Sequence, residues 1–444
     1  MIRKFTVLIL FMLGLTPVLF SQDAVVRLSL KEACLMGVEQ NIKVQNALLD
    51  TKRMNAQIQE TRSLLLPQIE GYSTLNYYYS IPKMILPGEI FGQTGLIPVQ
   101  IGTKYDFSNG LKASMMLFNQ SYFTSVKLAR QMENLSSLSV RQQKEEVVYQ
   151  VTQIYYLCLT TAKQIEFFSK NLENSHRMAE VAKLQSDNGM IRKIDFSRVS
   201  VNESNIQTQL DNLEQLEQQQ QRILKYLVGI NSYCQILLTD SLEYTGKAEP
   251  TIRPDFNDRT EILLINNQID NTALARKANQ QAYWPTLTGI GQYYYQGQRN
   301  SFDYFKGGDD KFFKVGLFGI SISIPVFDGF EKRSKTRQYD IQLMQMKNTL
   351  ADTKAYLTKE YTDAEGQYQS NLKAIQRQTE NIKVAEASYQ SSLQGYRQQV
   401  VSLSDLLLSE SSLTEARLSF TNALLQLKNA ELDIKKAKGE LLNF

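Results

Sequence analysis

Two kinds of hydrophobic spacing alternate along the chain, and they predict two kinds of element. From about residue 118 to 189, one set of positions recurs at intervals of four and three residues, the spacing of a coiled-coil seam: Val147, Val151, Ile154, Cys158, Thr161, Ile165, Phe168 and Leu172. A second seam is less regular, with interruptions at Lys354, Asn371 and Gln378; it comprises Leu350, Leu357, Tyr361, Ala364, Tyr368, Ile375, Ile382, Ala385 and Tyr389. A helix over 118–189 would be on the order of 100 Å long, which is far longer than a globular core needs.

Shorter segments alternate apolar and polar side chains, which predicts strands with one apolar face. The apolar positions are Ile69, Leu75, Tyr77 and Tyr79; Leu111, Ala113, Met115 and Leu117; and Phe318, Ile320, Ile322 and Ile324. Two tyrosine clusters accompany them, Tyr77, Tyr78 and Tyr79 in the first half and Tyr293, Tyr294 and Tyr295 in the second. This pattern matches a lipid-facing barrel wall with aromatic residues at the membrane interface and a wet interior. A sheet packed on a soluble core is the alternative.

Three markers recur in the same order and predict an internal duplication. Their offsets are 218, 209 and 210 residues for the pairs Pro67/Pro285, Phe118/Phe327 and Asp195/Asp405. Each half is expected to run helix, strand, loop, strand, long helix, turn, long helix, with each second strand leading directly into the long helix. We assign residues 22–230 to the first repeat, 231–258 to a linker and 259–444 to the second repeat. Chance similarity between helices rich in Gln and Leu is the alternative.

The N-terminal segment 1–21 has the features of an export signal. Arg3 and Lys4 precede an apolar run, and cleavage is expected near Ser21. A retained membrane anchor is the alternative, although the run is shorter than the ~20 residues that span a bilayer. No later apolar run is long enough for a membrane helix, so a mature chain that crosses a membrane would have to do so with strands.

Composition excludes several classes of chemistry. The net charge of +4 over 444 residues is too small to indicate nucleic acid. One His and three scattered Cys offer neither a metal site nor a Cys–His catalytic pair, and His176 is expected to be an exposed helix residue. The two glycines of GIGQYYYQG lie on a predicted strand, so a nucleotide site is not favoured. We therefore expect no enzyme activity, no cofactor and no metal.

The number of predicted strands bears on assembly. Four strands of this kind can be found, whereas membrane barrels need about eight to close without exposed edges. If the strands span a membrane, several copies must contribute to one barrel. The strand count does not fix how many.

These features together resemble the TolC-type outer-membrane efflux protein family. The resemblance rests on the prolines that open strands, the LFNQ and VFDG segments that close them, and the helix-tip segments 186–195 and 396–405. It implies a homotrimer whose twelve strands form one barrel in outer-membrane lipid, and whose helices form a tube through the periplasm. It further implies a passive exit channel of a tripartite efflux pump, working with a periplasmic adaptor and an inner-membrane transporter. A type I protein-secretion duct, or an exported structural coiled-coil protein without a barrel, are the alternatives.

The resemblance also marks residues at the helix tips. The family pattern is a tyrosine, a glycine three residues on, and an acid six further; Tyr396 and Asp405 follow it, with Gln399 in the glycine position. Gly189 and Asp195 match in the first half. These residues, Asp405, Tyr396, Asp195 and Gly189, are the candidates for the channel entrance and its gating, and a ring of Asp405 carboxylates could concentrate cations.

Two points stay open at the sequence level. Asp195 and Asp405 could instead serve as N-caps of the helices that follow the turns. The sequence predicts no structure for the apolar loop 81–103 and does not identify the transported substrate.

Overall fold

The computed structural model describes residues 25–243, 255–304, 306 and 312–443. The predicted export signal 1–21 lies outside these residues. The chain divides into two compact units. Unit 1 comprises Met1–Asn46, Val140–Arg259 and Ala355–Phe444, and unit 2 comprises Ala47–Ser139 and Thr260–Lys354.

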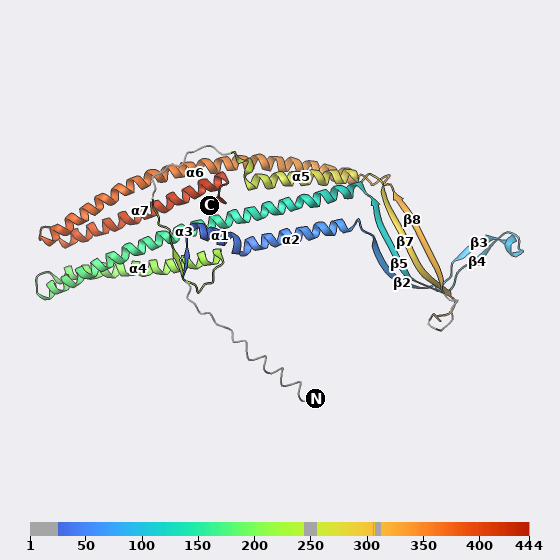
Figure 1. The fold of residues 1–444 in the computed structure, drawn as a ribbon, viewed down its shortest axis with the longest axis horizontal. Coiled ribbons are helices and arrows are strands. Elements are labelled where there is room, and N and C mark those ends of the chain that lie inside the picture. Colours follow the sequence, from blue (N-terminus) through green and yellow to red (C-terminus); the bar gives the residue numbers. More distant parts are fainter. Residues whose placement is uncertain (1–24, 244–254, 305, 307–311, 444) are drawn as a thin grey trace, which may run out of the picture. The chain divides into compact units, whose positions relative to one another are not determined.

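Helices dominate the described chain, and the long ones occur in matched pairs (Figure 1). Their bounds are α1 Leu30–Gln40, α2 Ile42–Ser63, α3 Gln120–Asp187, α4 Lys193–Val228, α5 Thr260–Gln281, α6 Glu331–Arg397 and α7 Leu403–Lys438. The first helical hairpin joins 68 and 36 residues, and the second joins 67 and 36. In the part of the chain that the structure describes, none of the helices has the length and apolar character that crossing a membrane requires.

Four strands of unit 2 form one antiparallel sheet in the order β2-β5-β7-β8. Their bounds are β2 Gln68–Tyr77, β5 Tyr105–Phe118, β7 Thr286–Arg299 and β8 Phe313–Ser323. β2 and β7 begin directly after Pro67 and Pro285, as predicted. The predicted duplication of helix, two strands and long helical hairpin is therefore confirmed, and the fold is mostly helical with this sheet.

One detail of the predicted repeat is wrong. β5 leads almost directly into α3, but β8 ends at Ser323 and α6 begins only at Glu331. Gly329 and Phe330 both have positive φ, so the chain turns between β8 and α6. Asp328 then caps α6, because its carboxylate accepts from the backbone N–H of Lys332 at 3.2 Å and its Oδ2 lies 3.1 Å from the Lys332 ammonium.

Two small β elements occur where the sequence predicted only a loop and a linker. Within 81–103, β3 Lys83–Pro87 and β4 Leu96–Gln100 form an antiparallel hairpin. Within the linker, β6 Ile236–Leu238 pairs in parallel with β1 Val26–Leu28. Three-residue strands and an apolar hairpin carry too weak an alternation to be recognised in a single sequence.

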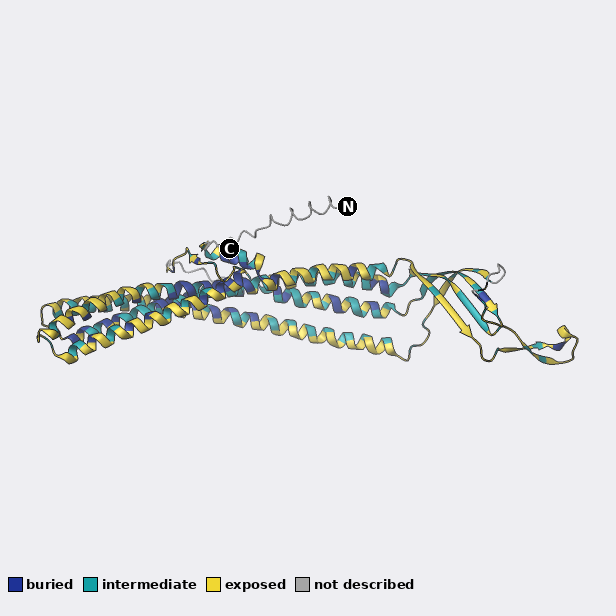
Figure 2. Ribbon diagram, turned by 90° about the horizontal axis from the view of Figure 1, so that it is seen from below, coloured by how far each residue is buried: buried dark blue, intermediate teal, exposed yellow. Residues whose placement is uncertain are grey.

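The core of unit 1 is made by the predicted seams. Val147, Val151 and Cys158 of α3 are buried in one cluster with residues of α1, α4, α6 and α7. In the second seam Leu357, Tyr361, Tyr368 and Ile375 are buried as predicted, and so is the supposed interruption Asn371. The Asn371 amide donates to the backbone carbonyl of Gln426 at 3.1 Å, which satisfies a polar group inside the seam. Figure 2 shows these buried stripes on the helices and exposed residues on their outer faces.

In unit 2, α2 and α5 pack beside the first turns of α3 and α6. Thr51 of α2 lies 2.9 Å from Ser136 of α3, hydroxyl to hydroxyl. Asn279 of α5 donates to the carbonyl of Lys332 and to the hydroxyl of Thr336, at 2.8 and 3.0 Å. These polar contacts hold α2 against α3 and α5 against α6.

Candidate functional site

The strand register gathers the predicted apolar positions onto one face of the sheet. Residues paired across antiparallel strands point to the same side. Ile69 is paired with Ala113, Ala113 with Gly291, and Gly291 with Phe318. The same face carries Leu111, Met115, Leu287, Tyr293, Ile320 and Ile322, and we call it the apolar face.

The apolar face is open to its surroundings. Phe318 is 83% exposed, and Ile69, Ile320 and Ile322 are each at least 60% exposed. Residues of the edge strands β2 and β8 are mostly exposed, and those of the middle strands β5 and β7 are mostly half-buried (Figure 2). A sheet packed on a soluble core would bury these side chains, so the exposed apolar face argues against that alternative.

The opposite face, which we call the polar face, carries three of the charged residues of the four strands, Glu70, Asp106 and Lys112, whereas Arg299 and Lys314 lie on the apolar face. Glu70 is paired with Lys112 across β2 and β5, and Asp106 accepts from the Gln296 amide at 3.1 Å. The remaining polar positions are Gln68, Thr74, Asn76, Ser108, Ser114, Thr288, Gln292, Gln298, Ser321 and Ser323. The two faces of the sheet are therefore suited to different solvents.

The six tyrosines singled out from the sequence do not share one location. Tyr77 ends β2 on the apolar face, and Tyr78 and Tyr79 lie beyond the strand, with Tyr79 93% exposed. Tyr293 and Tyr295 lie on the apolar face in the middle of β7, with ring centroids 5.9 Å apart. Their neighbour Tyr294 points to the polar face, where its ring lies 6.3 Å from that of Tyr72.

Aromatic side chains also gather at the end of the sheet remote from the helices. Phe107 contacts the rings of Tyr304 and Phe312, with centroids 5.3 and 6.0 Å apart. The guanidinium of Arg299 lies over Tyr304 at 4.5 Å from its centroid, a cation–π contact. Sequence reasoning missed this cluster, because its members come from two strands and the segment that follows β7.

The two helical hairpins turn with the same backbone geometry at their tips. In the first, the N–H of Gly189 donates to the carbonyl of Ser186 and that of Met190 to Gln185, at 3.0 and 2.7 Å. Equivalent bonds join Gln399 to Tyr396 and Val400 to Gly395, at 3.0 and 2.9 Å. This is a Schellman motif, which requires a left-handed residue. Gly189 takes that conformation at φ 72°, and Gln399 takes it at φ 62° although it is not glycine.

The N-cap role considered for Asp195 and Asp405 is wrong. The N-caps are Arg192 and Ser402, and each Asp is the third residue of its helix. Ser402 accepts from the Asp405 N–H at 3.2 Å and its hydroxyl donates to the Asp405 carboxylate at 2.7 Å. The sequence signal that predicts this arrangement is a serine followed three residues later by an acid.

Two arginines near the start of α4 interact with the Asp195 carboxylate. Arg192 donates to its carboxylate from Nε and Nη2 at 2.8 and 3.1 Å, and Arg198 lies 3.8 Å away. The hydrogen bond from Arg192 is the largest cause that lowers the pKa of Asp195. Asp405, by contrast, is exposed and has the Ser402 hydroxyl as its neighbour.

Contacts between the two hairpins form a distinct cluster near the tips, which we call the tip core. Ala179, Ala182, Val199 and Leu403 are buried there, and Tyr396 packs on them. Burial, and secondarily the charge of Asp195, raise the pKa of Tyr396. Tyr396 is thus part of the tip core, and Asp195 lies near enough for its charge to act on the Tyr396 phenol.

Two polar links cross between the hairpins beside the tip core. Arg198 donates to the Ser404 hydroxyl at 2.9 Å, and Asn202 donates to Glu410 at 3.2 Å. Glu410 is 5% exposed, and burial raises its pKa. No sequence motif marks these links, because their members lie more than 200 residues apart.

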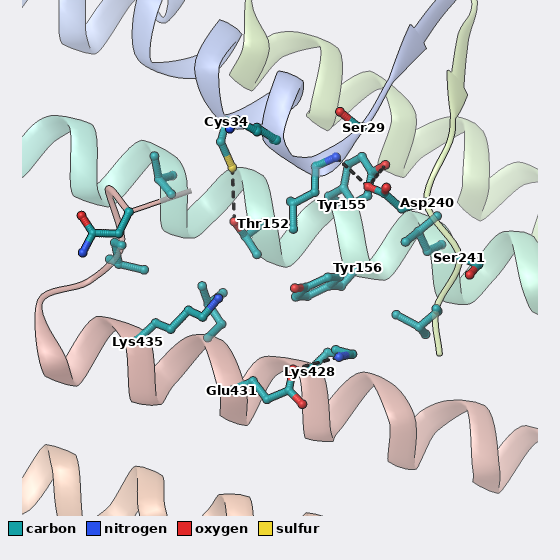
Figure 3. A pocket seen from close by; sticks show the side chains of 18 of the residues that line it. Ser29, Cys34, Thr152, Tyr155, Tyr156, Asp240, Ser241, Lys428, Glu431 and Lys435 are labelled. Atoms are coloured by element: carbon teal, nitrogen blue, oxygen red, sulfur yellow. Dashed lines mark hydrogen bonds and ion pairs between the residues drawn. The ribbon is translucent and has the colours of Figure 1, made fainter. Parts of the chain in front are cut away.

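A cavity of about 530 Å³ lies in unit 1 between α1, α3, α7 and residues 240–243. Figure 3 shows its side chains, with Tyr155 Oη 2.8 Å from Asp240 and Cys34 Sγ 3.5 Å from Thr152. Asp240 also accepts from the N–H of Leu30 at 2.7 Å. Burial raises the pKa of both the phenol and the thiol, so at neutral pH neither is in the ionised form used in nucleophilic chemistry. The cavity's polar groups hold α1 to α3.

The part of the chain with described coordinates contains no group of three or more His, Cys, Asp or Glu side chains placed to hold a metal ion. His176 is exposed, as expected, and its Nδ1 lies 2.7 Å from Glu203. The carboxylate is the main cause that raises the pKa of His176.

The fold is similar to those of several solved structures. The chain is similar in structure to CusC, with a TM-score of 0.73 and 17% identity over 92% of this chain and 91% of that one. It is similar to the CmeC outer membrane channel of Campylobacter jejuni, with a TM-score of 0.71 and 15% identity over 93% and 85% of the two chains. It is also similar to the MtrE outer membrane channel of Neisseria gonorrhoeae, with a TM-score of 0.67 and 16% identity over 93% and 89%.

No curated protein sequence matches the chain. The sequence profile of the family described as outer membrane efflux protein matches residues 38–230 and 267–440. These two segments hold both long helical hairpins and all four strands of the sheet. The chain belongs to the outer membrane efflux protein family, and its place is the outer membrane with an extension into the periplasm.

Proposed function

We propose that the protein is the passive exit channel of a tripartite efflux pump, assembled as a homotrimer. The observation that carries the proposal is the exposed apolar face of the sheet on a chain of this family. In this proposal the apolar face meets outer-membrane lipid, and the polar face lines the water-filled lumen.

The dimensions of the sheet fit this role. β5 and β7 have 14 residues each, which at ~3.4 Å per residue and a tilt of ~40° gives a height of roughly 35 Å. A lipid-facing band is ~25 Å tall and is flanked by aromatic residues. Tyr293 and Tyr295 would lie at the outer boundary of that band, and Trp284, exposed just before β7, at the inner one.

The sheet edges support assembly from several copies. β2 and β8 are the edge strands of the four-stranded sheet, and an open edge in lipid leaves backbone groups without partners. Pairing β2 of one copy with β8 of the next removes every edge once the ring closes. Three copies give twelve strands, the number that the family resemblance implies.

The helix tips are the proposed entrance. Tyr396, packed on the tip core, would help to hold the two hairpins together in the closed state, with Asp195 close by, and Asp405 would present one exposed carboxylate per copy to the pore. Gly189 and Gln399 would allow the tight turns that end the hairpins. A periplasmic adaptor and an inner-membrane transporter would open the tips and supply substrate and energy, after residues 1–21 have directed export.

The oligomer and the channel can be tested on the purified protein. We expect a detergent-stable trimer by light scattering, recovery in the outer-membrane pellet, and ion conductance in planar bilayers. Deleting the gene should sensitise cells to toxic compounds. Recovery as a soluble monomer after osmotic shock would contradict the proposal and favour an exported coiled-coil protein.

The role of Asp405 needs variants that separate its charge from its contact with Ser402. Asp405→Asn removes the charge and keeps an acceptor for the Ser402 hydroxyl, whereas Ser402→Ala removes the cap and keeps the charge. We expect Asp405→Asn and Asp405→Ala to raise conductance or weaken block by divalent cations, and Ser402→Ala to leave block unchanged. If divalent cations block all three variants equally, Asp405 has no effect on the pore and only contacts Ser402.

A further inference from the structure

We propose that Tyr72 and Tyr294 form a binding site for aromatic cations on the wall of the channel lumen. This inference rests on the proposed function, since it requires the polar face of the sheet to line a lumen. It follows from the position of Tyr294, which the strand register separates from its neighbours Tyr293 and Tyr295.

The two rings share one row of the sheet. Tyr72 of β2 is paired with Gly110 of β5, and Gly110 with Tyr294 of β7. Both tyrosines are half-buried, and their ring centroids are 6.3 Å apart at an interplanar angle of 52°. The rings therefore lie on either side of a position that has no side chain.

The glycine between the rings is required by the backbone. A Cβ added to Gly110 would lie 2.3 Å from the Tyr294 Cβ and 2.4 Å from the Tyr293 carbonyl oxygen. The close approach of β5 to β7 thus keeps the position between the rings empty. The tilted rings are too close to admit a third ring between them, so a ligand ring would lie across both.

The surroundings favour a positive charge on the ligand. The face of a tyrosine ring carries negative potential and attracts cations within about 6 Å of its centroid. The charged residues of the polar face in this part of the sheet are Glu70, Lys112 and Asp106, a net charge of −1 per copy at neutral pH. In the proposed trimer the site would occur three times at one height of the lumen.

The test compares two cations of similar size that differ in aromaticity: benzyltrimethylammonium and cyclohexylmethyltrimethylammonium. Saturation-transfer NMR titrations on the purified trimer are expected to show tighter binding of the aromatic ion. Tyr72→Leu and Tyr294→Leu should each weaken it by about two- to fivefold, and the double variant by roughly the product. Tyr293→Leu, on the opposite face, should leave the affinity unchanged, and Tyr294→Phe should retain it.

The outcomes separate this inference from the proposed function. Equal affinity for the two ions, or unchanged affinity in both leucine variants, would overturn the binding site. If the same protein still forms trimers that conduct in bilayers, the proposed channel function stands. A protein that forms neither trimers nor conducting channels would overturn the channel and the lumen site with it. Conductance of each variant, measured on the same preparation, shows that the fold has survived substitution.

Discussion

The two hairpin tips offer a direct measure of backbone strain, because they have the same turn with different residues in the left-handed position. A residue with a side chain at positive φ costs about 1–2 kcal/mol relative to the right-handed region. Glycine avoids that cost but loses about 0.4–1 kcal/mol through the greater freedom of the unfolded chain. Gln399→Gly should therefore stabilise the second turn by about 1 kcal/mol, and Gly189→Gln should destabilise the first by a similar amount.

The structure makes this a backbone effect. A Cβ added to Gly189 meets no atom within 4 Å, so a side chain there neither gains nor loses packing. Gln399 is exposed, and the two hydrogen bonds of its turn are backbone bonds that a glycine keeps. Conformational preference is the main difference that remains between the two residues.

Hydrogen exchange measured by mass spectrometry on peptides that contain Met190 or Val400 reports the opening of each turn. A change of about 1 kcal/mol corresponds to a protection factor changed roughly fivefold. We expect protection at Val400 to rise in Gln399→Gly and protection at Met190 to fall in Gly189→Gln. Peptides from α5 should be unaffected in both variants.

Gln398→Gly is the matched control, because Gln398 lies in the same turn directly before Gln399 and does not have positive φ. Glycine there should lower protection at Val400, since it adds freedom to the unfolded chain without relieving strain. The reasoning would be refuted if Gln399→Gly also lowered protection, or if Gly189→Gln left the first turn unchanged.

Further variants probe the sheet and the tips. Gly110→Val should prevent assembly in the outer membrane, because its Cβ would lie 2.3 Å from a β7 side chain. Gly71→Val should be tolerated, because the nearest atom to its Cβ would be 3.8 Å away. The amount of each variant in the outer-membrane fraction tests both expectations. Glu410→Gln should stabilise the trimer at neutral pH by about 1–2 kcal/mol, since one buried carboxylate oxygen finds no partner among the described residues. Because burial raises the pKa of Glu410, protonation removes the cost of a buried charge in the folded state, so denaturant titrations should show a gain in stability as pH falls that the Gln variant lacks. Glu203 raises the pKa of His176, so the charged imidazole stabilises the fold fully below pH 6.5, and this stabilisation is lost as pH rises through the folded-state pKa. The melting temperature should therefore fall between pH 6 and pH 8, and His176→Gln should abolish the part of this fall that His176 causes.

The sequence by itself determined the long helices, the four strands and their duplication. Periodicity is a local property: the seam through Val147 and Val151 repeats every three or four residues, and Phe318 and Ile320 alternate with polar neighbours. The prolines before β2 and β7 mark strand starts for an equally local reason, since proline and its predecessor have restricted backbone angles.

Only the tertiary structure decided which residues meet. Three consecutive tyrosines look alike in sequence, but the period of two in a strand sends Tyr294 to the face opposite Tyr293 and Tyr295. The links from Arg198 to Ser404 and from Tyr396 to the tip core join segments about 200 residues apart. Such contacts depend on how whole helices and strands are placed against each other, and no local pattern in a single chain records that placement.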